Sequence, residues 1–201
     1  DNNIFFSVGD CTGHGVPGSF MSMLGLSALN EIVKSLPVCK ASSVLDHLRD
    51  RIQESLHQGS ERELTTYDGM DIGLCIYNVD TKVMQFSAAH NPLYLIRNGE
   101  IMIYKPDKID IGRYSVEKTE FSNHLIQCMG GDILYLFSDG YADQFGGPRS
   151  RKYKSQGFRD YLLSIHKESM EDQRRLLDEE IENWRGNLPQ IDDIMVMGKK
   201  I

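Results

Sequence analysis

The sequence lacks the features that mark nucleic-acid-binding and membrane-spanning proteins. Its formal net charge is −7 over 201 residues, and no run of Lys and Arg is longer than two. A basic surface for nucleic acid is therefore not expected. No apolar stretch approaches the roughly 20 residues that span a bilayer, and no signal-peptide pattern opens the chain. Direct membrane insertion is not expected either.

Cysteine is also scarce. The four cysteines are scattered and form no CxxC pair: Cys11, Cys39, Cys75 and Cys128. Their spacing does not fit a zinc finger, and Cys75 and Cys128 lie in apolar runs typical of buried strands. This pattern favours a reduced, cytoplasmic setting.

The length and the 40% hydrophobic content allow a single domain over residues 1–201 with a substantial core. The chain begins almost inside a strand and ends on one. We therefore expect an N-terminally truncated piece, the C-terminal output domain of a longer signalling protein. A sensor, regulatory or membrane-tethering region upstream of residue 1 is compatible with this interpretation.

The stretch Phe5–Gly18 contains the first chemistry-bearing residue. An apolar run ends at Asp10 and is followed by glycines at positions 13, 15 and 18, with Pro17 at the start of a helical pattern. This order predicts a strand, a tight loop and a helix. An acid at the end of a buried strand is costly unless a positive group meets it. A metal or phosphate site is one interpretation, and an ordinary turn with a capping Asp is the other.

Periodicity predicts the remaining elements. Helical spacing is found at 18–36, after 41–43, at 158–165 and at 170–184. Short β-branched and aromatic runs predict strands at 72–79, 83–87, 93–97, 100–104, 119–127, 132–138 and 194–197. Asn98-Gly99 predicts a hairpin turn, 119–127 and 132–138 are expected to pair through Gly130-Gly131, and 146–152 is expected to be a flexible basic loop. The order indicates an α+β fold around antiparallel sheets.

Three acidic positions share one arrangement, in which a carboxylate stands at the end of an apolar strand. Asp10 and Asp139 follow such runs, and Asp192-Asp193 precedes one. Converging carboxylates repel one another unless a cation balances them. Oxygen ligands suit Mg²⁺ or Mn²⁺ better than zinc.

Four segments carry a family resemblance: GDCTGHGVPGSFMSMLG, FSAAHNPLYLI, GDILYLFSDGYAD and DDIMVMG. In this order they resemble the metal-dependent (PPM, protein phosphatase 2C-like) Ser/Thr phosphatases, specifically the bacterial branch of sporulation stage II protein E and the stress sigma-factor phosphatases. The resemblance covers nearly the whole chain. It implies a four-layer α-β-β-α sandwich of two antiparallel sheets flanked by helices, and two Mn²⁺ or Mg²⁺ ions with a bridging water.

The resemblance also implies roles for individual residues. Asp10 would bridge both metals, the Cys11 carbonyl would bind one, and Asp139 and Asp192 would be further ligands. Asp193 ranks second to Asp192, because the family often has Asn at that position. Phosphate or substrate would lie against Gly13, Gly15 and Gly140, and Gly140 would allow a close turn.

Other residues keep two interpretations. His14 would protonate the leaving seryl oxygen or make a structural hydrogen bond, and for His90 a structural role is favoured over catalysis. Asp68 and Asp71 would support the metals or cap a turn, and Asp143 would bind a metal or cap the helix after Gly140. A redox role for the Cys11 side chain is the minor alternative to an incidental thiol.

By resemblance, the substrate would be a phosphorylated regulator of the anti-sigma-factor antagonist type, attacked by a metal-activated water without a protein nucleophile. The alternatives are a phosphatase-fold binding module with little turnover, and a hydrolase of nucleotides or small phosphoesters. A homodimer is compatible with the sequence. The family's Gly-Asp strand before Asp10 is missing from this chain, so we expect loose metal binding unless that strand is added.

Overall fold

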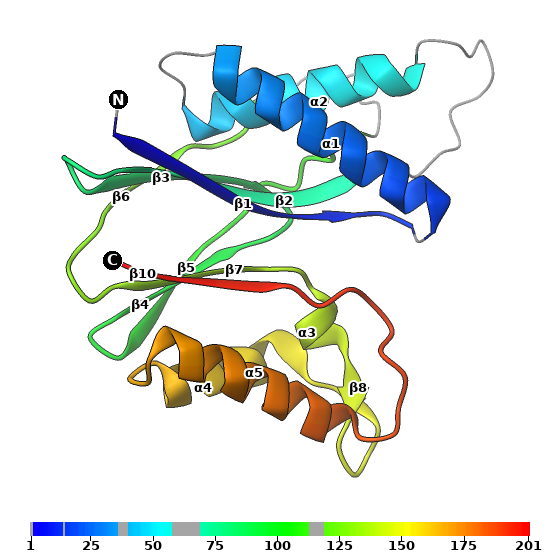
Figure 1. Cartoon of the computed structure of the whole chain (residues 1–201), viewed down its shortest axis with the longest axis vertical. Helices are drawn as coiled ribbons and strands as arrows, with labels where there is room; N and C mark the ends of the chain where they lie inside the picture. Colours follow the sequence, from blue (N-terminus) through cyan, green and yellow to red (C-terminus); the bar gives the residue numbers. More distant parts are fainter. Residues whose placement is uncertain (1, 14, 36–39, 58–68, 113–118) are drawn as a thin grey trace. The chain divides into compact units, whose positions relative to one another are not determined.

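The structure, a computed structural model, describes residues 2–13, 15–35, 40–57, 69–112 and 119–201 (Figure 1). It divides into two compact units. The first comprises Asp1–Pro92 and Lys105–Gln127, and the second comprises Leu93–Tyr104 and Cys128–Ile201. Each unit combines an antiparallel sheet with helices, so the α+β class is confirmed.

The first unit is a four-stranded sheet in the order β1-β2-β3-β6. Its elements are β1 (Asn3–Cys11), α1 (Val16–Ser35), α2 (Ala41–His57), β2 (Met70–Asn78), β3 (Val83–Ala89) and β6 (His124–Gln127). Figure 1 shows α1 and α2 covering one face of this sheet. The helices bury apolar side chains at intervals of three and four against β2, as the periodicity predicts. This core includes Met21, Ala28, Leu45, Leu48, Ile52, Ile72, Leu74 and Ile76.

The second unit has the strand order β10-β7-β4-β5. Its elements are β4 (Leu93–Arg97), β5 (Glu100–Tyr104), β7 (Ile133–Phe137), α3 (Gly140–Asp143), β8 (Phe145–Gly146), β9 (Arg151–Lys152), α4 (Lys154–Ile165), α5 (Met170–Arg185) and β10 (Val196–Lys200). Figure 1 shows α4 and α5 packed on one side of this sheet. All five residues of β7 are buried, in agreement with its continuous apolar run.

The predicted hairpin at Asn98-Gly99 is confirmed. Arg97 pairs with Glu100 across the turn, and both turn residues have positive φ, 53° and 79°. Two consecutive positive φ values characterise the turn that best matches the twist of paired strands.

The strand predicted at 119–127 is wrong in its first half, because only His124–Gln127 is a strand. In this half, side chains form hydrogen bonds with backbone groups that would otherwise pair with a neighbouring strand. The Thr119 carbonyl accepts from Arg49 Nη1 at 2.6 Å, and the Phe121 N–H donates to Asp46 Oδ1 at 3.2 Å. A backbone held in this way cannot extend the strand pairing.

The expected pairing of 119–127 with 132–138 is also wrong, because β6 pairs with β3 and β7 with β4 and β10. The turn at Gly130-Gly131 is bonded to the end of the chain instead: Gly131 N–H donates to the Ile201 carbonyl, and Ile201 N–H donates to that of Asp132. Two smaller expectations are corrected as well. The last strand is predicted at 194–197 and begins at Val196. Residues 146–152 are predicted to be a loop and belong to the β8–β9 hairpin and its turn.

No helix within the described ranges is long and apolar enough to cross a membrane.

Candidate metal centre

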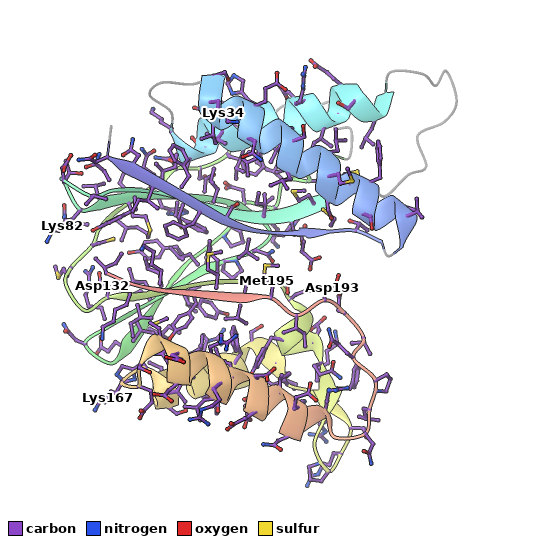
Figure 2. The ribbon with its side chains drawn as sticks, viewed as in Figure 1. Lys34, Lys82, Asp132, Lys167, Asp193 and Met195 are labelled. Carbon is purple, nitrogen blue, oxygen red and sulfur yellow. The ribbon has the colours of Figure 1, made fainter. Side chains whose placement is uncertain are left out.

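The end of β7 and the segment before β10 are joined at Ser138 in the second unit. Ser138 is 3% exposed. Its hydroxyl donates to the Asp193 carbonyl at 2.8 Å and accepts from the Met195 N–H at 2.9 Å. Its own N–H donates to the Met195 carbonyl at 3.0 Å. Three hydrogen bonds therefore hold the Asp139 end of β7 against the Asp192-Asp193 segment, whose Asp193 and Met195 are labelled in Figure 2.

Gly140 makes this contact sterically feasible. A Cβ atom at Gly140 would lie 2.4 Å from the Asp193 carbonyl oxygen, which is backbone and cannot move aside easily. The sequence predicts only a close turn at Gly140, and the structure adds a physical reason for glycine at this position, the neighbouring Asp193 main chain.

Asp192 and Asp193 both reach solvent. Asp192 Oδ1 accepts from the Asp193 N–H at 2.8 Å, which orients one carboxylate oxygen and leaves the other available. Asp139 is the N-cap of α3, but its side chain makes no capping hydrogen bond. The second unit thus presents exposed acidic side chains from two segments that Ser138 holds together.

These acids interact electrostatically. Burial of the carboxyl raises the pKa of Asp139 most, the negative charges of Asp192 and Asp143 raise it further, and Lys152 lowers it. Asp143 is not a helix cap, because it is the last residue of α3 and its Oδ2 accepts from Lys152 Nζ at 2.6 Å. A raised carboxyl pKa marks a place where a cation would relieve crowded negative charge.

In the first unit, Asp10 stands directly opposite Asp71 in the antiparallel pairing of β1 with β2. Opposed residues of an antiparallel pair project from the same face with Cβ atoms about 4.5–5.5 Å apart. Like charges in this position destabilise the pair unless a cation or a donor lies between them. The register therefore makes Asp71 the acidic neighbour of Asp10, a placement that the sequence left undecided.

The loop after Asp10 has the expected glycine geometry. Gly13 and Gly15 have φ values of 94° and 69°, which favour glycine. A Cβ atom on Gly18 would lie 2.5 Å from the Gly13 carbonyl oxygen. The Thr12 N–H donates to the Gly69 carbonyl at 2.9 Å and ties the loop to the start of β2. The predicted strand, tight loop and helix are confirmed.

The surroundings of the Cys11 side chain disfavour its thiolate form. Burial raises its pKa most, a hydrogen bond with Ser22 lowers it, and the charge of Asp10 raises it again, with a net upward shift. A thiol with a raised pKa is a poor nucleophile. This favours the interpretation of its side chain as incidental.

Two further histidines and one acid were singled out by the sequence. His90 has a φ of 62°, and its Nε2 lies within hydrogen-bonding distance of Asp110 Oδ1, at 3.0 Å, inside the first unit. This arrangement supports the structural role. His14 and Asp68 lie outside the described residues.

The donor set fits Mn²⁺ or Mg²⁺ in its chemistry, because it consists of carboxylate and carbonyl oxygens in negatively charged surroundings. Among the residues that the structure describes, no three His, Cys, Asp or Glu side chains are grouped closely enough to hold an ion as they stand.

Sequence reasoning missed two residues of this region. Ser138 is not among the residues that the sequence singles out, because its hydrogen-bonding partner, Asp193, is 55 residues away in the chain. Lys152 was placed in a flexible basic loop, although it pairs with Asp143. In the sequence, the Lys152–Asp143 contact is indicated only by the basic character of residues 149–152, which follow soon after the acidic motif that ends at Asp143.

Comparison with known families and solved structures identifies the fold. Residues 1–200 match the family described as Stage II sporulation protein E (SpoIIE). The SiaA-PP2C domain of Pseudomonas aeruginosa is similar, with a TM-score of 0.86 and 23% identity over 99% of this chain and 79% of that one. No curated protein matches the chain.

Two further structures agree. The PP2C phosphatase domain of SpoIIE from Bacillus subtilis, solved with a fragment of its regulatory domain, gives a TM-score of 0.74 at 19% identity, covering 99% of this chain and 55% of that one. The Mycobacterium tuberculosis serine/threonine phosphatase PstP/Ppp gives 0.66 at 14% identity, covering 100% and 92%. Because the family model spans residues 1–200 and these structures share the PP2C fold, the chain belongs to the SpoIIE family and is a metal-dependent protein phosphatase domain of the PP2C type.

Proposed function

We propose that this domain removes phosphate from phosphoserine or phosphothreonine in a small regulatory protein of the anti-sigma-factor antagonist type, with two Mn²⁺ or Mg²⁺ ions. The observation that supports it most is the hydrogen-bonded junction at Ser138, which presents Asp139 beside Asp192-Asp193 in a family of phosphatases. A fold that served only to bind a partner would gain nothing from crowding these carboxylates.

The proposed ligands are Asp10, the Cys11 carbonyl, Asp139, Asp192 and Asp193. Divalent ions bound there would lower the pKa of water and offset charge on the phosphoryl oxygens. The protein's own contribution is to hold the acids at fixed positions. Ser138 and Gly140 do this for the second unit, and the pairing of β1 with β2 does it for Asp10.

Substrate contacts are proposed for the glycine loop. The positive φ values of Gly13 and Gly15 turn the backbone before α1, where N–H groups can meet a phosphate oxygen. His14, between them, is proposed to protonate the leaving seryl oxygen. The upstream regulatory domain expected from the sequence is supported by the B. subtilis SpoIIE structure, which includes a fragment of such a domain. We place this activity in the cytoplasm.

The test is phosphate release from a phosphoserine peptide with and without Mn²⁺. We expect release only with the metal, and a loss of at least about 100-fold in kcat/KM for Asp139→Asn, as expected when a group that organises the transition state is lost. Asp160→Asn is the matched control, because Asp160 is an exposed acid of α4 whose carboxylate accepts a hydrogen bond from Gln156 Nε2 at 2.8 Å.

Each alternative gives its own result. If the protein binds a phosphopeptide without releasing phosphate at any Mn²⁺ concentration, the binding-module interpretation replaces the enzymatic one. If nucleoside phosphates are hydrolysed in preference to every phosphopeptide, the substrate class is wrong while the metal chemistry stands.

A further inference from the structure

The second unit carries a concentration of positive charge that the proposed catalytic chemistry does not use. Four cations fall within six residues of the β8–β9 turn and the residue that opens α4: Arg149, Arg151, Lys152 and Lys154. All four are exposed. We call residues 145–154 the basic hairpin. It stands out in a chain whose formal net charge is −7.

The basic hairpin is fixed to the unit at its base. The Gly147 N–H donates to the Trp184 carbonyl at 2.8 Å, and the Tyr153 N–H donates to the Gln144 carbonyl at 3.0 Å. Trp184 Nε1 also donates to the Gln144 carbonyl, at 3.1 Å. A Cβ on Gly146 would lie 2.0 Å from the Trp184 carbonyl oxygen, so the strand rests directly on the end of α5.

Aromatic packing adds to this support. The Tyr153 ring packs edge-on against both Tyr141 and Trp184, with centroid distances of 5.4 and 5.1 Å. The Tyr153 hydroxyl donates to Glu180 Oε1 at 2.9 Å. The exposed cations therefore stand on a packed base, so little conformational freedom of the backbone would be lost when they bind a partner.

Two residues of the basic hairpin adopt backbone conformations that are costly for their type. Ser150 has a φ of 46° and Lys154 a φ of 72°. Residues other than glycine rarely occupy this region, and such conformations gather at functional sites. The Ser150 N–H donates to the Gly147 carbonyl at 3.2 Å, which closes the turn that presents Arg149.

Among the described residues, one of the four cations has an acidic partner. Lys152 Nζ lies 2.6 Å from Asp143 Oδ2. Within the described part of the chain, Arg149, Arg151 and Lys154 make no ion pair, although the second unit is rich in Asp and Glu. Charges left unpaired on a rigid turn are available to an acidic ligand, and they raise its local concentration.

The basic hairpin also adjoins the acids of the proposed active site. Its Lys152 binds the last residue of α3, a four-residue helix whose N-cap is Asp139. A polypeptide that extended from Asp139 along α3 would reach the β8–β9 hairpin, which carries Arg151 beside Lys152 and Arg149 in its turn. Phe145, which is 38% exposed and pairs with Lys152 across the hairpin, adds an apolar contact.

We propose that the basic hairpin is a docking site for an acidic segment next to the phosphorylated residue of the substrate protein, with Arg149, Arg151 and Lys154 as specificity-determining residues. This inference rests on the proposed function, because it assigns the substrate's flanking sequence to the same site. The metal centre would bind the phosphate itself, and the basic hairpin would bind the acidic residues beside it.

The test uses three phosphoserine peptides that differ only in their flanks: two Asp, two Ala or two Lys on either side. The wild-type protein should prefer the acidic peptide over the alanine peptide by about tenfold in kcat/KM, since each exposed ion pair contributes up to about fivefold. The double variant Arg149→Glu/Arg151→Glu should lose that preference or favour the lysine peptide. The preference should also shrink between low and high salt.

Lys167→Glu is the matched control. Lys167 is an exposed cation of the same unit, and Figures 1 and 2 show it at the opposite end of the α4–α5 pair from β8. The acidic-to-alanine ratio should be unchanged in this variant. Lys152 is left intact throughout, because its loss would also alter Asp143.

A second measurement does not need turnover. Fluorescence anisotropy with the three peptides carrying a non-hydrolysable phosphonate gives the Kd ratio directly. A wild-type protein that binds all three equally, or a double variant that keeps the acidic preference, overturns the docking site. If Lys167→Glu loses the preference for the acidic peptide to the same extent as the double variant, the docking site is also overturned, because net charge alone would then explain the preference. Absence of phosphate release together with an intact acidic preference would count against the proposed function and not against the hairpin.

Discussion

The Ser138 hydroxyl donates to the main-chain carbonyl of Asp193 at 2.8 Å, from a side chain that is 3% exposed. It also accepts from the Met195 N–H. One small side chain thus satisfies two backbone groups of a segment far away in the chain. The arrangement positions the acidic residues on either side of the junction.

Ser138→Ala should weaken both the fold and the metal site. Removing the hydroxyl leaves the Asp193 carbonyl and the Met195 N–H without this partner, which costs about 1–3 kcal/mol in the free energy of unfolding. We expect the Kd for Mn²⁺ to rise about tenfold, as for other residues that orient metal ligands. Urea denaturation and calorimetric Mn²⁺ titration measure the two effects. A variant with lower stability but an unchanged Kd would show that Ser138 is structural only.

Gly140→Ala should displace the Asp193 main chain, because the added Cβ would lie 2.4 Å from its carbonyl oxygen. Overpacking of this kind costs about 1–3 kcal/mol, and Mn²⁺ affinity should fall with it. Gly130→Ala is the control, since a Cβ there would meet nothing within 4 Å. Thermal unfolding with and without Mn²⁺ compares the two. Equal behaviour of both variants would contradict the steric role of Gly140.

Asp71→Asn tests the pairing of Asp10 with Asp71. Removing one of two opposed like charges should stabilise the metal-free protein by about 0.2–1 kcal/mol. The same change should reduce the extra stability that Mn²⁺ gives, because one negative group near Asp10 is lost. Melting temperatures in EDTA and in Mn²⁺ are the readout. A lower melting temperature in EDTA would show that Asp71 is held by favourable contacts and does not repel Asp10.

Asp132 gives a prediction about pH. Its carboxylate is 1% exposed and meets Arg97 twice, at 2.9 Å from Nε and 2.6 Å from Nη2, and the Met129 N–H at 2.8 Å. Burial raises the pKa of Asp132, but the hydrogen bonds from Arg97 and Met129 and the charge of Arg97 lower it more, so it lies below its usual value.

A carboxyl whose pKa is lowered by folding adds stability above its unfolded pKa of about 3.9, and this contribution is lost as the pH falls through the folded pKa. Asp132→Asn should therefore cost about 3 kcal/mol at pH 7, the lower end for breaking a buried pair, and less as the pH falls below about 4. Denaturation at several pH values checks this. Figure 2 shows Asp132 and Asp193 at opposite ends of the sheet, so Mn²⁺ binding should not change. A pH-independent difference would contradict the ion-pair explanation.

Local chemistry made much of the fold readable from the sequence. The Asn98-Gly99 turn, the spacing of Val44, Leu45, Leu48 and Ile52, and the glycines around Thr12 each depend on neighbours within a few residues. Propensity and periodicity act at that range. The acids at strand ends were also visible, because a charge that closes an apolar run is recorded in the sequence itself.

Tertiary structure alone decided which strands share a sheet and which backbone groups meet. Residues 119–123 have a strand-like composition, yet Arg49 and Asp46, more than 60 positions away, take up their hydrogen-bonding groups. The hydrogen bond from Ser138 to Asp193 joins residues 55 positions apart. The pairing of Asp10 opposite Asp71 depends on the register of β1 and β2. Local sequence determines the shape of each segment, but partners are chosen by satisfying buried polar groups over the whole chain, and no short window of residues contains that information.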